Sequence, residues 1–162
     1  GWGGRPVVVR WVSEGRMVER CPEHSPVEFH ETGRAACFWV DVHEDRRAGQ
    51  RAAQERMEQL ITQALMPVID VLEQTGEING KLIWSNTGYL IHWYLTEMKP
   101  LLGDEKVDAL RQSCFVAKQL SDGRDNPLFR TVVPRDGLLV RRTCCQRNRL
   151  PDVQQCGDCT LK

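Results

Sequence analysis

Residues 57–72 read MEQLITQALMPVIDVL, and their apolar side chains recur every three or four positions. This spacing puts them on one face of an α-helix, so the pattern predicts a long amphipathic helix over about Arg46–Gln74. Pro67 stands inside the pattern and should kink the helix or split it in two, because proline lacks a backbone N–H and its ring crowds the preceding turn. Gly76 is a typical helix stop.

Two further helices are predicted after this one. Asn79-Gly80 precedes a second helix that ends at Pro100, and its apolar residues again fall at helical spacing. A third helix, capped by Asp104, should run to about Leu120. Its predicted inward face carries Val107, Leu110, Cys114 and Ala117. The middle of the chain is therefore expected to form a helical bundle.

The first third of the chain has the composition of β-strands. Val7–Val12 is rich in β-branched residues, and Val27–Glu31 and Arg34–Val42 flank Thr32-Gly33, which suggests a hairpin with a tight two-residue turn. A short strand is predicted at Leu138–Arg141. The expected fold class is α+β, with N-terminal antiparallel strands, a central helical bundle and a C-terminal cysteine-rich tail.

Seven cysteines are the unusual feature of the composition, and four of them lie in the last nineteen residues. Cys144 and Cys145 are adjacent, ten residues follow, and Cys156 and Cys159 then form a Cys-x-x-Cys pair. The second pair has the spacing at which two sulfurs converge on one metal. Adjacent cysteines usually diverge, so a centre with two irons and bridging sulfides accommodates them better than a single ion does.

Other uses of these sulfurs remain open on spacing alone. The same four thiolates could hold structural zinc, and Cys156 and Cys159 could act as a dithiol–disulfide pair. The plant-type ferredoxin spacing is absent from the sequence. Cys21, Cys37 and Cys114 are interpreted as small buried hydrophobic residues, and Trp84 and Trp93 as packing residues.

The C-terminal segment resembles the FhuF family of ferric-siderophore reductases. Its Cys-Cys-x10-Cys-x2-Cys spacing matches that family, as do the preceding basic residues, the Leu150-Pro151 pair and the closing Cys-Gly-x-Cys. Residues 84–90 (WSNTGYL) and 126–129 (NPLF) are weaker echoes of the same family. The chain is shorter than the family at its N-terminus.

This resemblance implies a [2Fe–2S] cluster with Cys144, Cys145, Cys156 and Cys159 as its ligands. It also implies reduction of a ferric siderophore, of hydroxamate type in the first instance, with electrons from an external donor. We expect residues 1–136 to form a mixed strand and helix body and residues 137–162 to form the cluster-binding segment. Arg141, Arg142, Arg147 and Arg149 are expected to balance thiolate charge and to attract the substrate or the donor.

The composition excludes some classes of protein. Lys plus Arg and Asp plus Glu both total 22, so the formal net charge is zero, which argues against a general nucleic-acid binder. The longest apolar run, Ala35–Val40, is far shorter than the roughly 18 residues of a membrane helix, so no membrane span is expected. The odd number of cysteines and the lack of a visible export signal favour the reducing cytoplasm. The alternatives are a non-enzymatic iron–sulfur electron carrier or sensor and a zinc-stabilised binding domain.

Overall fold

The structure is a computed structural model that describes residues 17–18, 27–31, 35–38, 42–43, 50–149 and 151. The chain forms two compact units, Gly1–Met57 and Glu58–Lys162. Helices predominate in the second unit, and short antiparallel strand pairs occur in both. The α+β class expected from the sequence is confirmed. Among the described residues, no helix combines the length and the apolar character needed to cross a bilayer.

Two antiparallel strand pairs belong to the first unit. β1 (Met17–Val18) pairs with β4 (Val42–His43), and β2 (Val27–Phe29) pairs with β3 (Ala35–Phe38). The predicted hairpin is therefore present, with Phe29 opposite Ala35 as its last described pair and an irregular register between Glu28 and Phe29. Val7–Val12 and Thr32-Gly33 lie outside the described residues.

The first helical stretch runs without a break from residue 53 to residue 74, in three segments. They are α2 (Ala53–Gln59), the π-helical turn η3 (Leu60–Leu65) and α3 (Met66–Gln74). Pro67 occupies the first turn of α3, so the predicted interruption takes the form of a π-helical turn directly before the proline. Wider hydrogen bonding there accommodates a residue that has no N–H to offer. The stretch ends as predicted, with Gly76 at a φ of 73°.

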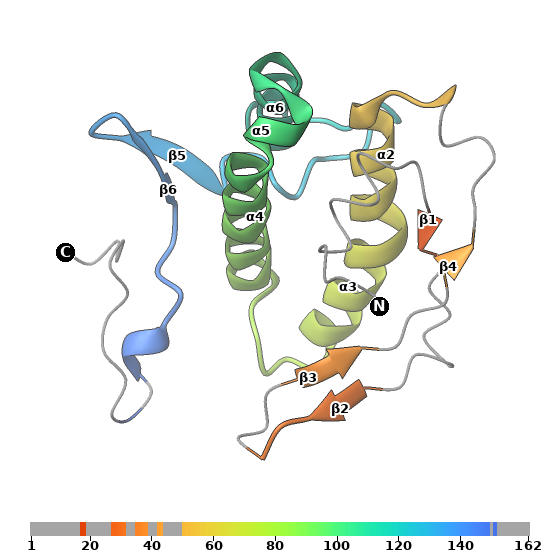
Figure 1. The fold of residues 1–162 in the computed structure, drawn as a ribbon. Coiled ribbons are helices and arrows are strands. Elements are labelled where there is room, and N and C mark those ends of the chain that lie inside the picture. The colour runs from red at the N-terminus through yellow and green to blue at the C-terminus, as the bar shows by residue number, and fades with distance from the viewer. Residues whose placement is uncertain are drawn as a thin grey trace. The chain divides into compact units, whose positions relative to one another are not determined.

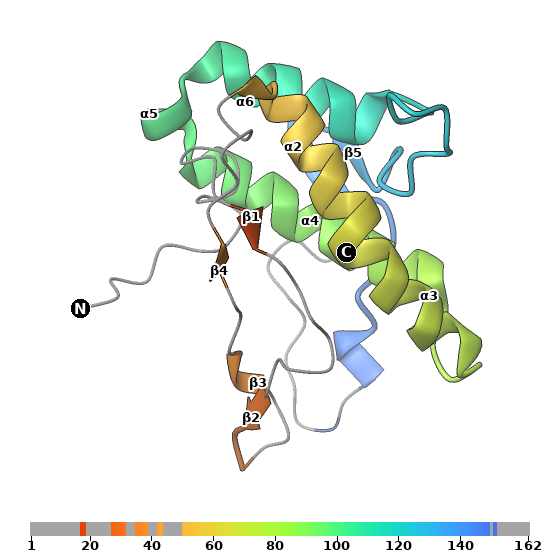
Figure 2. The same ribbon diagram turned by 90° about the vertical axis from the view of Figure 1, so that its right-hand side faces the viewer.

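The central helix of the second unit is α4 (Gly80–Glu97). Its first turn is capped by Asn79, whose side chain accepts the Lys81 N–H at 2.8 Å, and the Glu73 carboxylate accepts the Gly80 N–H at 3.3 Å. α3 and α6 both contact α4 (Figure 2). α4 is thus the element against which the rest of this unit packs.

The third predicted helix is shorter than expected. It consists of α6 (Asp104–Arg111) and a closing π-helical turn, η4 (Gln112–Val116), and the separate short helix α5 (Lys99–Leu102) precedes it. Its N-cap is Gly103, at a φ of 84°, and not Asp104, which lies inside the first turn and forms an ion pair with Lys99 at 3.2 Å. Val107, Leu110 and Cys114 are buried as predicted, and Ala117 is half-buried.

A β-hairpin follows these helices and lies beside α4 (Figure 1). β6 (Leu138–Arg141) has the predicted bounds, and it pairs antiparallel with β5 (Val132–Arg135), which the sequence analysis did not predict. Asp136 and Gly137 both have positive φ, 52° and 78°, as the two-residue type I′ turn requires. The chain then leads through the cysteine pair to the short 3₁₀ turn η5 (Arg147–Arg149).

Candidate metal centre

Cys144 lies three residues beyond the end of β6, and its half-buried sulfur already takes part in two polar contacts. The Gln146 backbone N–H donates to the sulfur at 3.3 Å, and the thiol donates to Asn148 Oδ1 at 3.6 Å. Gln146 adopts a left-handed φ of 61°, which turns the chain sharply after the cysteine pair and brings its own N–H back to the sulfur. An N–H donated to sulfur stabilises the thiolate form that binds iron.

The donor set of this segment fits an iron–sulfur cluster as far as the structure describes it. Cys144 is a free thiol, and Cys145 beside it is half-buried. Cys156 and Cys159 lie outside the described residues, and within residues 50–149 and the other described stretches no group of three or more candidate ligands is assembled. The four-cysteine ligand set therefore stays a prediction. Its first two members, Cys144 and Cys145, are soft sulfur donors, and the Gln146 N–H points at the Cys144 sulfur.

A cavity of about 410 Å³, here called the cysteine cavity, opens beside Cys144. Its opposite wall is the beginning of α4, where Asn79, Lys81 and Leu82 lie. The N-terminal end of a helix carries a partial positive charge, and the Lys81 ammonium adds a full one. Arg149, which follows the cysteine pair, lines the same cavity. Positive charge therefore lines the cavity on both sides of Cys144.

The four arginines expected around the cluster have different environments. Arg142 and Arg149 are exposed, and the side chain of Arg147 lies outside the described residues. Arg141 is only 8% exposed; its Nη1 donates to Asn86 Oδ1 at 3.0 Å and its guanidinium lies 5.0 Å from the centre of the Tyr89 ring. Arg141 thus fastens β6 to α4, while Arg142 and Arg149 present their charge to solvent.

A closely packed seam anchors the strand that leads to the cysteine segment (residues 143–149). Gly88 of α4 meets the loop after η4 so closely that a Cβ at this position would lie 2.2 Å from Thr131 Oγ1. Leu128 of that loop is fully buried. The Arg142 N–H donates to the Thr131 carbonyl at 2.9 Å, so the strand that leads to the cysteines is hydrogen-bonded to the same loop. We call Gly88, Asn126, Leu128 and Thr131 the α4–loop seam.

Asn126 organises the loop from inside. Its side-chain amide donates to the carbonyls of Ser113, Cys114 and Ala117 at 2.9–3.1 Å, and its Oδ1 accepts the Leu128 N–H at 3.0 Å. These carbonyls belong to the end of η4, which has no further turn to satisfy them. The two weaker sequence echoes, residues 84–90 and 126–129, therefore meet at the seam, through Gly88 and Leu128.

The seam also forms a cleft that sequence reasoning missed. Trp84 and Ser85 from α4 and Phe129 and Arg130 from the loop line it, although they are far apart in the sequence. Trp84 and Trp93 are both predicted to be packing residues. Trp84 is half-buried and lines this cleft. Trp93 is 49% exposed and is therefore not part of the core. Residues 84–90 and 126–129 resemble the same family as the cysteine motif, and this shared resemblance could have indicated that the two segments lie together near the cysteines.

Cys114 shows the opposite environment to Cys144. It is buried in the core, and desolvation raises the pKa of its thiol to about 12. The interpretation of Cys114 as a buried hydrophobic residue is confirmed. Cys21 lies outside the described residues, and of Cys37 only its place in β3 is described. His92 on α4 is half-buried, and burial together with the Arg111 charge lowers its pKa.

Two family descriptions match the chain. Residues 5–139 match the family described as "Ferric iron reductase FhuF-like transporter", and residues 141–161 match the "FhuF 2Fe-2S C-terminal domain". A protein of Escherichia coli (strain K12) named "Ferric siderophore reductase" is 66% identical over 157 residues. That match covers 97% of this chain and 60% of the relative, so the chain spans about three-fifths of the length of this relative.

Proposed function

The chain belongs to the FhuF-like ferric iron reductase family and carries its [2Fe–2S] C-terminal domain, and from this premise we propose that it is a ferric-siderophore reductase. The family resemblance predicted from the sequence is confirmed. The observation that carries the proposal is the position of Cys144: a half-buried thiol with an N–H aimed at its sulfur, beside a cavity lined by Lys81 and Arg149.

We assign the cluster ligands to Cys144, Cys145, Cys156 and Cys159. The Gln146 N–H supports this assignment, because a hydrogen bond to sulfur stabilises the ligating form. When bound, the [2Fe–2S] group supplies one electron at a time. Within the chain, Lys81, Arg149 and the N-terminal end of α4 offset negative charge at the sulfurs. Residues 137–162 form the cluster-binding segment and residues 1–136 the body, and the junction of the two family matches supports this boundary.

The reaction follows from the chemistry of the substrate. A siderophore holds Fe(III) through hard oxygen donors, and one electron converts the metal to Fe(II), which such donors hold far more weakly. The freed donor oxygens take up protons from water, so the organic ligand is recovered intact. Electron transfer falls steeply with distance. The described side chains of the cysteine segment are exposed except for the half-buried cysteine pair, so a chelate can approach it.

The partners belong to the same proposal. Ferric hydroxamates are the substrates to test first, and the electrons come from an external donor, since the sequence holds no nucleotide-binding glycine motif. We place the protein in the cytoplasm, where thiols stay reduced; the odd number of cysteines, seven, supports this, because it does not fit a fully paired set of disulfides.

The test uses anaerobically purified protein. Iron, inorganic sulfide and zinc are measured first, and dithionite-reduced protein freed of excess dithionite is then mixed with ferric hydroxamates in the presence of a ferrous-iron trap. We expect two irons and two sulfides per chain and one ferrous ion trapped per cluster. A cluster without transfer to any ferric chelate would contradict the reductase and leave a carrier or sensor, and a colourless protein with stoichiometric zinc would contradict the cluster itself.

A further inference from the structure

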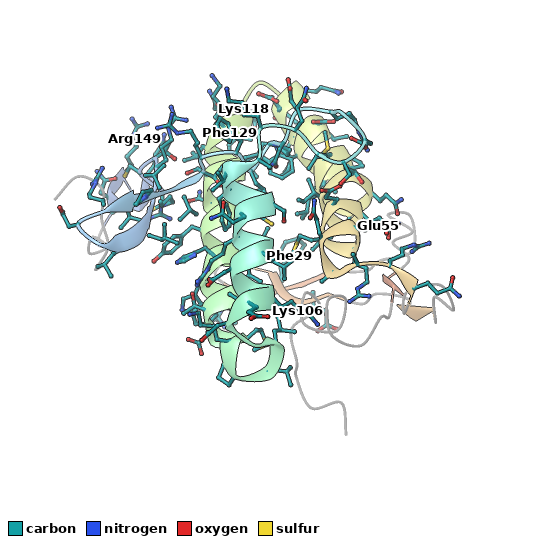
Figure 3. The ribbon with its side chains drawn as sticks, turned by 90° about the horizontal axis from the view of Figure 1, so that it is seen from above. Phe29, Glu55, Lys106, Lys118, Phe129 and Arg149 are labelled. Carbon is teal, nitrogen blue, oxygen red and sulfur yellow. The ribbon has the colours of Figure 1, made fainter. Side chains whose placement is uncertain are left out.

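A cleft of about 410 Å³ adjoins the cysteine cavity and shares Lys81 and Thr143 with it. We call it the Trp84 cleft. One wall is α4 and the other is the loop that precedes β5; Phe129 of this loop, labelled in Figure 3 together with Arg149, lies near α4. The residues used below are Lys81, Trp84, Ser85, Phe129, Arg130 and Arg142.

The lining of the cleft has the chemistry of an anion site with apolar walls. Lys81, Arg130 and Arg142 contribute three positive charges, and among the described residues no carboxylate lines the cleft. Trp84 and Phe129 are half-buried and offer flat aromatic surfaces. A bound molecule would therefore meet positive charge at the rim and aromatic surface on the walls.

Ser85 provides an independent sign of a missing ligand. It lines the cleft, is 2% exposed, and its hydroxyl has no hydrogen-bond partner among the residues that the structure describes. A buried hydroxyl without a partner is unfavourable, so such groups usually have a ligand or an ordered water to bind. The Ser85 hydroxyl is placed to donate to an oxygen of a molecule in the cleft.

The backbone holds the two arginines in position. Arg130 has a left-handed φ of 55°, which is unfavourable for a residue other than glycine, and its N–H donates to the Phe115 carbonyl at 2.9 Å. Arg142 is fixed by its own N–H, which donates to the Thr131 carbonyl at 2.9 Å. Both guanidinium groups therefore extend from backbone that is already ordered, and this lowers the entropic cost of binding.

We propose that the Trp84 cleft binds the ferric chelate and that it favours chelates of net negative charge. This inference rests on the proposed function, because only a reductase needs a chelate beside the cysteine segment. Thr143 lines both hollows and is the residue directly before Cys144, so a molecule in the cleft lies next to the first predicted cluster ligand. Charge selection follows from the three cations and the aromatic walls.

Redox-inert gallium chelates test the cleft separately from electron transfer. A linear trihydroxamate with one free amine gives a cationic Ga(III) complex; its N-acetyl derivative is neutral and its N-succinyl derivative anionic. Calorimetric titration of the cluster-containing protein should give a Kd about tenfold lower for the anionic than for the cationic complex, and the difference should shrink as salt rises from about 0.05 M to about 0.5 M. Equal affinity for the three complexes would overturn the proposal.

Three single variants locate the site. Arg142→Gln and Arg130→Gly should each raise the Kd of the anionic complex about five- to tenfold. Arg142→Gln keeps the backbone bond to Thr131, and Arg130→Gly relieves the left-handed φ, so neither should lower the melting temperature. Lys106→Gln, on the exposed face of α6 and outside the cleft, removes the same charge and should leave the Kd unchanged. An unchanged Kd in both arginine variants, or a Lys106→Gln effect of the same size, would also overturn it.

Ferric reduction separates this inference from the proposed function. If reduced protein transfers electrons to ferric chelates but the arginine variants do not raise KM, the cleft assignment fails and the reductase stands. If the gallium complexes bind with the expected charge order but no ferric chelate is reduced, the cleft stands and the reductase fails. Both results come from the same set of purified proteins.

Discussion

The α4–loop seam and the cysteine segment differ sharply, although the Arg142 N–H bonds the strand between them to the seam. In the seam, Leu128 is fully buried and Asn126 satisfies three carbonyls at once. In the cysteine segment, Cys144 is half-buried and its contacts are local ones with Gln146 and Asn148. The fold thus packs the seam tightly and leaves Cys144, a proposed ligand, accessible at the edge of that packed part.

Cys114 and Cys144 repeat this difference at the level of single residues. Cys114 lies in the core, where burial raises the pKa of the thiol to about 12 and the reactive thiolate is suppressed. Cys144 lies beside Lys81 and Arg149 and has a backbone N–H donated to it. The two cysteines therefore differ in their environment, and this difference is the basis for proposing Cys144, and not Cys114, as a cluster ligand.

The largest effect is expected from Cys144→Ser. Hydroxyl oxygen is a poor substitute for a thiolate at iron, so bound iron and sulfide should fall to near zero. Far-ultraviolet circular dichroism of the purified variant should stay the same, because Cys144 lies outside the buried core.

Cys114→Ala is the matched control and should keep its iron. A Cys144→Ser protein with a full complement of iron would contradict the ligand assignment, and loss of helix in that protein would mean that the cluster supports the whole fold.

The next largest effect is expected from Gly88→Ala. The added methyl group would lie 2.2 Å from Thr131 Oγ1, so α4 and the loop must move apart, and the free energy of unfolding should fall by about 3 kcal/mol. Urea denaturation monitored by circular dichroism measures this change.

Gly80→Ala serves as the control within the same helix. Its new methyl group would meet only the end of the flexible Glu73 side chain, so the loss should be clearly smaller. Equal losses in the two variants would show that the seam is no tighter than the helix end.

A comparison of two asparagines tests the hydrogen bonds of the two regions. Asn126→Ala leaves three carbonyls near the end of η4 without their donor and should cost about 2 kcal/mol of unfolding free energy. Asn148→Ala, in the exposed cysteine segment, should change it by less than about 0.5 kcal/mol. The same denaturation series decides, and a larger loss for Asn148→Ala would reverse our view of which region is rigid.

The smallest effect concerns pH and Cys114. Burial raises the pKa of the folded-state thiol from its ordinary value of 9.0 to about 12. Below pH 9 the thiol is protonated in both states; above it the unfolded chain loses the proton first, so stability falls as pH rises, until about pH 12. One such group lowers the unfolding free energy by at most about 1.4 kcal/mol per pH unit.

The stability curves of the parent and Cys114→Ala proteins between pH 8.5 and pH 10 provide the measurement. We expect the parent protein to lose stability more steeply than Cys114→Ala over this interval. Parallel curves would mean that the Cys114 thiol ionises as readily in the folded protein as in the unfolded chain.

Much of the helical part could be predicted from spacing, because α3 and α4 keep one apolar face over several turns. The end of the third helix could not be predicted. Apolar spacing continues to Leu120, but the helix stops at Val116, where the Asn126 amide donates the hydrogen bonds that a further helical turn would have supplied. β5 was missed because Pro134 argues against a strand, whereas Asp136-Gly137 is a strong hairpin signal.

The candidate site divides in the same way. The cysteine motif is local in sequence, so its spacing could be read directly, and the family resemblance then chose a cluster over zinc or a dithiol pair. The Trp84 cleft could not, since Trp84, Arg130 and Arg142 come together only through the contact of α4 with the loop and the hairpin. Likewise, four neighbouring arginines look equivalent in the sequence, and only packing separates the buried Arg141 from the exposed Arg142.

The bond from the Arg142 N–H to the Thr131 carbonyl limits how far the first cysteine can travel. Two residues of fully extended chain span at most about 7 Å, so the Cα of Cys144 stays within that radius of the anchored Arg142. The backbone of Cys144 therefore stays next to the Trp84 cleft, which Thr143 also lines.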